Sequence, residues 1–197
     1  IPPDYLNIPG AMGNVIQYIY MTPVLVDIRF GNWKSLLERK EPVPGQVYAR
    51  ILWLFGQGMA KAHTSDLPGA GKMLSEMEIL SADSVLKLPF TPFSPAIDGA
   101  VIAMELLRGT IYLKQAEGDK AIAAFRKAVT TEAGMVYNEP RDWLINPRHY
   151  LADACINKGD YKEAQQIIGA DLAVNNENGW SLYGYWQLLN AQHKTEA

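Results

Sequence analysis

One glycine-rich segment of the sequence invites comparison with a phosphate-binding loop. Residues 68–73 read Pro-Gly-Ala-Gly-Lys-Met. A phosphate-binding loop has a glycine five residues before the glycine that precedes its lysine, and a Ser or Thr after the lysine. Asp66 and Met73 occupy these two places here. We therefore predict that the segment is a glycine-containing start of a helix and not a nucleotide site.

The histidines and the single cysteine do not form a pattern typical of metal binding. His63, His149 and His193 are widely separated, and no two histidines lie four residues apart as on one face of a helix. A zinc site needs His, Cys or carboxylate side chains that converge on one point. Cys155 is expected to be a small buried side chain and not a nucleophile. We expect no metal and no cofactor.

Two further groups contain residue types that perform catalysis elsewhere. His63, Ser65 and Asp66 include the members of a serine-hydrolase triad, but they are neighbours at a predicted turn, and a triad is defined by roles in space. Glu76 and Glu78 lie two residues apart on a predicted helix, where their side chains do not face each other. The sequence therefore predicts no catalytic residue and a protein that is not an enzyme.

The composition is that of an ordinary globular protein. The 197 residues are 48% hydrophobic and 20% charged, with a net charge of −3. The net charge and the scattered basic residues argue against a nucleic-acid partner. No apolar stretch reaches the ~20 residues of a membrane span. The opening residues 1–4 resemble neither a signal peptide nor a protein start, so we expect the C-terminal fragment of a longer chain, and the single cysteine favours the cytoplasm.

The strongest signal in the sequence is a repeat. Four segments each place a turn former and then Asp or Asn before a predicted helix. Their last residues are separated by 34, 51 and 43 residues, which is a period of 34 with excesses of 17 and 9. The excesses fall on the segments richest in loop signals, residues 89–95 and 135–147. The four anchor residues are Leu36, Ala70, Ala121 and Ala164.

Side-chain size follows the same period. Twelve residues before the anchors, three of four positions are small; four residues after them, three of four are large and apolar. A small residue allows two helices to approach closely, and a large one fills the groove opposite. A ~34-residue period with this pattern resembles the tetratricopeptide repeat. The earlier positions are Val24, Gly58, Gly109 and Ala152, and the later ones are Lys40, Leu74, Phe125 and Ile168.

This resemblance implies an all-α fold, a right-handed α-α superhelix made of one domain over residues 1–197. The expected repeats span residues 13–41, 45–82, 95–131 and 142–174, and a helix within residues 177–194 caps the array. The nine expected helices are 13–29, 33–39, 45–63, 68–80, 95–115, 120–131, 142–158, 161–172 and 180–193. Three stretches, residues 29–33, 137–143 and 171–182, also resemble the C-terminal part of large bacterial tetratricopeptide proteins of unestablished activity.

The resemblance further implies that the first helix of each repeat lines a concave groove. We expect a partner protein or peptide to bind there. The groove would run from apolar side chains to polar ones. The positions carried over from the family are Tyr18, Met21, Leu25, Arg29, Leu52, Phe55, Met59, His63, Thr110, Lys114, His149, Asp153 and Asn157.

Three functions remain open at this point. The first is a protein-interaction module that binds a peptide or protein in the groove or through its two long inserts. The second is a structural element that completes and caps a longer solenoid, in which case upstream repeats of the same chain cover the groove. The third is a small-molecule or catalytic site under the proline-rich segment 89–95. A groove filled by the chain's own loops would favour the second function, unless a closed polar pocket favoured the third.

Overall fold

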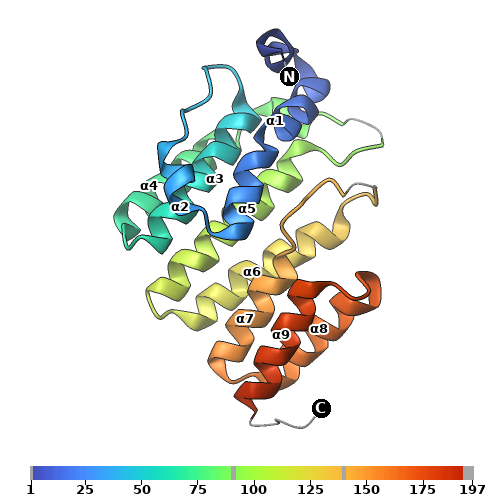
Figure 1. Cartoon of the computed structure of the whole chain (residues 1–197). Helices are drawn as coiled ribbons and strands as arrows, with labels where there is room; N and C mark the ends of the chain where they lie inside the picture. The colour runs from blue at the N-terminus through green and yellow to red at the C-terminus, as the bar shows by residue number, and fades with distance from the viewer. Residues whose placement is uncertain (1, 90–91, 139–140, 193–197) are drawn as a thin grey trace.

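The computed structural model describes residues 2–89, 92–138 and 141–192, and within these ranges the chain is helical and contains no β-strand (Figure 1). The prediction of an all-α fold is confirmed. Two short 3-10 helices, η1 (Pro3–Asn7) and η2 (Ser84–Lys87), accompany the α-helices. The α-helices are α1 (Gly10–Phe30), α2 (Trp33–Glu38), α3 (Val47–His63), α4 (Leu67–Leu80), α5 (Ala96–Lys114), α6 (Gly118–Gly134), α7 (Pro147–Lys158), α8 (Tyr161–Val174) and α9 (Gly179–Ala191).

Each of the nine predicted helices has a counterpart in the structure, with ends that agree to within a few residues except in one case. The helix predicted from Asp142 begins at Pro147, because the Asn146 side chain accepts a hydrogen bond from the Arg148 backbone N–H and caps the helix there. The end of the last predicted helix, His193, lies outside the described residues. The two 3-10 helices, η1 and η2, were not predicted.

The sequence predicts that an Asp or Asn in each of the four turn segments caps the helix that follows. Two of the four helices are capped in this way. The Asp66 side chain accepts from the Gly69 N–H, and Asp160 accepts from the Glu163 N–H. The carboxylate of Asp66 thus occupies the helix start that resembles a phosphate-binding loop. Asn32 and Glu117, which precede α2 and α6, make no such capping bond.

Consecutive helices pack against each other along the whole array, and α1, α3 and α5 also pack side by side. Helices α7 and α9 do the same at the other end, where both contact α8. The contact between α5 and α7 is slight. The segment between α6 and α7 crosses in front of this junction (Figure 1).

Two of the expected small residues, Gly58 and Gly109, lie where helices approach closely. A Cβ atom at Gly109 would lie 2.3 Å from the Cε1 atom of Phe125, on the second helix of the same predicted repeat. A Cβ atom at Gly58 would instead lie 2.5 Å from Leu107, on α5 of the following repeat. The anchors Ala70, Ala121 and Ala164 are fully buried. Small residues are therefore required both within a helix pair and between pairs.

We expect Gly109→Ala to lower the free energy of unfolding by about 1–3 kcal/mol, because the Phe125 ring must move to admit the methyl group. The matched control is Gly71→Ala in α4, where an added Cβ meets no atom within 4 Å. That control is expected to be neutral or more stable by about 0.5–1 kcal/mol, as alanine favours helix. Urea unfolding of both variants checks this, and equal shifts in both would contradict it.

Candidate functional site

Much of the predicted groove is buried in the protein's own core. Six of the thirteen predicted residues are inaccessible, because the neighbouring helices and the segment that precedes α7 cover them. A partner does not reach them in this structure, and they pack helix against helix. These six residues are Met21, Leu25, Leu52, Phe55, Met59 and Thr110.

The segment that covers this surface is the second predicted insert. Trp143 is only 4% exposed, and its ring lies 6.2 Å from the rings of both Tyr18 and Phe55. Next to it, the Leu144 N–H donates to the hydroxyl oxygen of Tyr18 at 3.0 Å. Burial raises the pKa of the Tyr18 hydroxyl, so Tyr18 stays neutral. The insert therefore packs its aromatic residue onto the array, and the apolar half of the predicted groove is occupied.

The polar half of the predicted groove contains a chain of hydrogen bonds that links distant helices. The Arg29 guanidinium, at the end of α1, lies 3.2 Å from Nδ1 of His149 on α7. Because arginine only donates, Nδ1 must accept, and the ring proton is on Nε2. Nε2 lies 3.0 Å from Oγ of Ser181 and 3.3 Å from Oδ2 of Asp171. The chain thus joins α1 to α7, α8 and α9.

Asp171 is the centre of this network, and its side chain is buried. It accepts hydrogen bonds from His149, Ser181, Asn146 and Asn175. Burial opposes ionisation, but these four bonds outweigh it and hold the pKa of Asp171 well below its usual range. Reasoning from the sequence missed this role. The only local signal was an aspartate near the C-terminal end of a predicted helix, where the helix dipole disfavours negative charge.

Asp171, His149 and Ser181 include the residue types of a hydrolase triad, but their bonding differs from that of a triad. In a triad the two imidazole nitrogens have different partners, the nucleophile on one and the acid on the other. Here Ser181 and Asp171 share Nε2, and the Ser181 hydroxyl donates to Asp171. Ser181 is also buried. This geometry holds three helices together and provides no activated nucleophile.

The remaining predicted groove residues face the solvent. His63 stacks on Trp33, with ring centroids 4.2 Å apart and planes 7° apart. His63 is solvent-accessible but crowded by neighbouring protein atoms, and this loss of hydration, together with the charge of Lys114, lowers the pKa of its ring to about 4. Asn157 donates to Asp153 at 3.2 Å. Asp153 is solvent-accessible but crowded by neighbouring protein atoms, and this loss of hydration raises the pKa of its carboxyl group.

The two long inserts meet over α1 and α5. The Ser94 N–H donates to Asp142 at 2.7 Å, the Val136 N–H donates to the Ser94 hydroxyl, and Asn138 donates to both Asp142 and the Pro92 carbonyl. A mainly apolar pocket of about 290 Å³ lies beneath them, which we call the loop pocket. It is lined by Ala11, Asn14, Val15, Tyr18, Ile19, Tyr48, Leu88, Phe93, Ser94, Pro95, Ala96, Gly99, Met135, Arg141 and Asp142.

Tyr48 contributes a hydroxyl group to the wall of the loop pocket. Tyr48 is 4% exposed, and its hydroxyl makes no hydrogen bond with any of the described residues. Its hydroxyl oxygen lies so close to α5 that a Cβ at Gly99 would be 2.1 Å away. Burial raises the pKa of the Tyr48 hydroxyl, which therefore remains a neutral hydrogen-bond donor on a mainly apolar wall.

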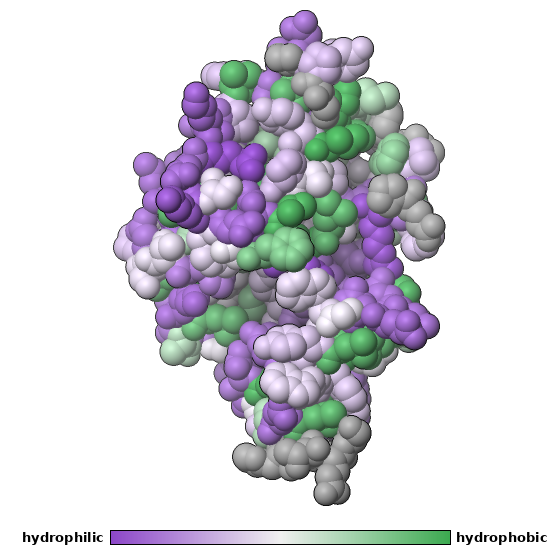
Figure 2. Space-filling model, in the orientation of Figure 1, coloured by the Kyte–Doolittle hydropathy of each residue, from purple (hydrophilic) through white to green (hydrophobic). Residues whose placement is uncertain are grey.

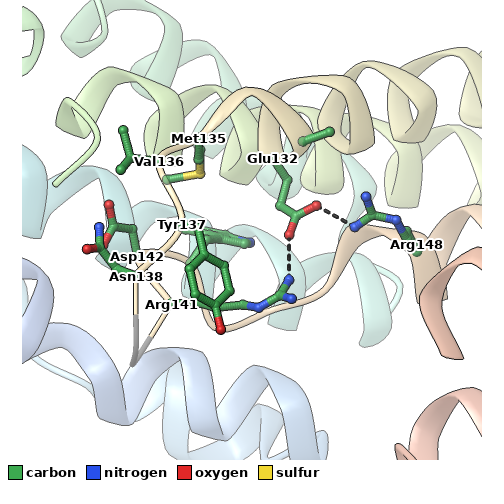
Figure 3. Close-up of a pocket in the computed structure, with 10 residues that line it drawn as sticks. Glu132, Met135, Val136, Tyr137, Asn138, Arg141, Asp142 and Arg148 are labelled. Atoms are coloured by element: carbon green, nitrogen blue, oxygen red, sulfur yellow. Dashed lines mark hydrogen bonds and ion pairs between the residues drawn. The ribbon is translucent and has the colours of Figure 1, made fainter. Parts of the chain in front are cut away.

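A second cavity, of about 250 Å³, lies between α1, α7 and the second insert, and we call it the Arg29 cavity. Beside it, Glu132 is shared by two arginines, Arg141 at 3.1 Å and Arg148, as Figure 3 shows in a neighbouring pocket. The Arg29 cavity is lined by Arg29, Glu132, Arg141, Trp143, Leu144, Asn146, His149, Asn175 and Asn178.

Other sequence candidates lie apart from these cavities. Cys155 is fully buried in the core, and burial raises the pKa of its thiol to about 11. The described parts of the chain contain no group of three or more His, Cys, Asp or Glu that could hold a metal ion. Among the helices within those parts, none is long and apolar enough to cross a membrane. His193 falls outside the described residues.

Helix α9 has an exposed aromatic face, visible in Figure 2 as rings at the surface in the lower half of the molecule. Trp180, Tyr183 and Trp186 are 44%, 55% and 57% exposed. Tyr183 stacks on Trp186 with centroids 5.5 Å apart, and Trp180 meets Phe30 edge to face. The helix expected to cap the array therefore presents aromatic side chains to the solvent.

Comparison with known proteins gave no match, whether to a family model, to a curated protein or to a solved structure. The candidate sites therefore depend on their geometry alone.

We expect the His63 ring to titrate well below the value of about 6.5 for a free histidine. The Lys114→Gln variant should raise the midpoint, because it removes the nearby positive charge. Lys72→Gln, a change to an exposed residue of α4, should leave the midpoint unchanged. Imidazole C–H shifts followed by NMR between pH 3 and 8 provide the measurement, and a wild-type midpoint at or above 6.5 would count against the predicted environment.

We expect Asp171→Asn to lower the free energy of unfolding by about 1–3 kcal/mol at neutral pH. The folded pKa of Asp171 lies below the unfolded value of about 3.9, so its contribution is present above that pH and is lost as pH falls through the folded pKa. The difference between wild type and variant should therefore shrink below about pH 4.

Urea unfolding across a pH series checks this. The control is Asp119→Asn, whose carboxylate is exposed and should contribute little. A difference for Asp171→Asn that stays constant down to pH 2 would disprove the ionised network.

Proposed function

We propose that the chain is a non-catalytic helical-repeat module of the tetratricopeptide type, and that it binds a protein or peptide partner through the loop pocket. The observation that carries the proposal is an apolar pocket of about 290 Å³ whose rim is formed by exposed apolar side chains. Ile19, Leu88 and Phe93 on this rim are 55%, 41% and 36% exposed.

The repeat type is supported by the way the helices pack. In a stack of helix–turn–helix units, each unit contacts only its neighbours. Helices α1 to α6 largely follow this order, with α3 against α1, α2, α4 and α5, and α6 against α5 and α7, although a slight contact between α1 and α5 skips one unit. The close approach of Gly109 to Phe125 supplies the expected contact of a small with a large residue inside one pair.

A protein or peptide suits the loop pocket better than a small molecule does. The pocket lies at the lower end of the ~300–1,000 Å³ range of small-molecule sites. A free small molecule would fill the interior and leave Ile19, Leu88 and Phe93 in water. A peptide that inserts one large apolar side chain would cover the rim as well, as anchor residues do at protein interfaces. The Tyr48 hydroxyl would then donate to a carbonyl or side-chain oxygen of the partner.

The alternative of a purely structural cap is opposed by helix α9. Terminal elements of solenoids have a polar outer face, because no further repeat covers them. The exposed Trp180, Tyr183 and Trp186 do not provide such a face. Trp143 occupies the apolar half of the predicted groove, and this does agree with the structural alternative. For this reason the proposed binding surface is the loop pocket and not the groove.

The charge and the thiol are in keeping with a protein partner inside the cell. A net charge of −3 matches a protein or peptide better than a nucleic acid. The buried Cys155 thiol agrees with a reducing compartment such as the cytoplasm.

The test is selection of a randomised peptide-display library on the wild-type protein. We expect enriched peptides to share a large apolar residue. Their affinity should fall at least tenfold for Val15→Trp, since the new indole fills the pocket. The matched control is Val26→Trp, at an exposed position on the same helix that lines none of the three pockets described above.

Two outcomes would overturn the proposal. The first is no enrichment, or enrichment of peptides that bind Val15→Trp as well as wild type. The second is saturable binding of small apolar compounds at the loop pocket without any peptide binding, which would establish the small-molecule alternative.

A further inference from the structure

The Arg29 cavity is lined by hydrogen-bond donors that lack an acceptor among the described residues, and each of these donors favours an oxygen atom as its partner. We propose that this cavity binds a small oxyanion, such as a carboxylate or phosphate group, held by Arg29, Arg141 and the indole N–H of Trp143. This inference goes beyond the proposed interaction function and does not depend on it, since the two cavities share only Arg141 among their lining residues.

Arg29 has no acidic partner among the described residues. One guanidinium nitrogen contacts His149, and the guanidinium carbon lies 4.5 Å from the centroid of the Trp180 ring. Neither neighbour carries a negative charge that neutralises it. Burial lowers the pKa of Arg29, although the charge of Asp171 partly offsets this. A half-buried guanidinium with unused N–H groups strongly favours a planar oxyanion as its partner.

Trp143 supplies a second, independent observation. Its side chain lines the cavity and is 4% exposed, and its indole N–H is buried without a hydrogen-bond acceptor among the described residues. A buried donor without an acceptor is rare in proteins and costs free energy. A ligand oxygen that reached the indole nitrogen would accept this hydrogen bond. Tryptophan donates but never accepts, so the missing group must be an acceptor.

The rest of the cavity wall adds positive charge and one more donor. Its single carboxylate, Glu132, is already shared by Arg141 and Arg148, so positive charge remains in excess (Figure 3). The side-chain oxygen of Asn178 accepts hydrogen bonds from the backbone N–H groups of Trp180 and Ser181, at the start of α9. Its amide N–H groups therefore remain available to a ligand. Two arginines and an amide donor favour an anion over a cation at this wall, although Asn175, which donates to Asp171, also presents an amide oxygen.

The experiment is an NMR titration of the tryptophan indole N–H signals with inorganic phosphate and, separately, with succinate, at constant ionic strength set by chloride. The chain has five tryptophans, and the Trp143 signal is the one absent from Trp143→Phe. We expect that signal to move and saturate with at least one oxyanion. Phosphate and succinate distinguish the two oxyanion classes.

Variants separate a site from general charge effects. Arg29→Gln should weaken the response about tenfold or more, the usual effect of losing a charge-assisted hydrogen bond. The control Arg126→Gln, at an exposed arginine that pairs with Glu163, should leave it unchanged. If Trp143→Phe does not fold, Phe variants of the other four tryptophans assign the Trp143 signal by elimination. This includes Trp180, whose ring also contacts Arg29.

The proposal is overturned if no indole signal saturates, if chloride produces the same shifts, or if Arg29→Gln and Arg126→Gln respond alike. These outcomes leave the peptide-binding function untouched, because that function is tested at the loop pocket with Val15→Trp.

Discussion

Burial of the Trp143 ring between Tyr18 and Phe55 is the contact on which the arrangement of the inner surface depends. An aromatic side chain buries about 150–250 Å², which at about 25 cal/mol per Å² corresponds to roughly 4–6 kcal/mol. This is a substantial part of the stability of a single domain. The segment around this ring forms part of both cavities: Arg141 lines both of them, Asp142 lines the loop pocket, and Trp143 and Leu144 line the Arg29 cavity. Both candidate sites therefore exist because the insert is folded inward.

The polar network around Asp171 holds the opposite end of the insert. Asn146 begins α7 and also donates to Asp171, so the start of the helix and the junction of α7 with α8 are fixed by one side chain. His149 extends the network to Arg29 on α1. A buried carboxylate is costly unless its hydrogen bonds are satisfied, and four donors satisfy this one. Because Asp171 needs all four hydrogen bonds, the residues that donate them, which include Asn146, His149 and Asn175 in the wall of the Arg29 cavity, are held in place.

The sequence predicted the helices well because their signals are local. A period of 34 residues, capping aspartates at positions 66 and 160 and small residues such as Gly109 are visible without knowledge of distant contacts. The candidate sites depend on other information. Tyr18 and Leu144 are 126 residues apart in sequence, and Arg29 and His149 are 120 apart. Nothing in the local pattern fixes such pairs, so the predicted open groove and the observed filled one fit the same periodicity equally well.

The link from α1 to α7 also changes how the array should come apart. A stack in which each unit touches only its neighbours can fray from either end, one helix pair at a time. Here Arg29 reaches His149, and Phe30 reaches Trp180, across most of the chain. Helix α1 is thus in direct contact with α7 and α9, at the other end of the array. Unfolding of either end breaks contacts made by the other end. This coupling favours unfolding of the whole array in a single cooperative step.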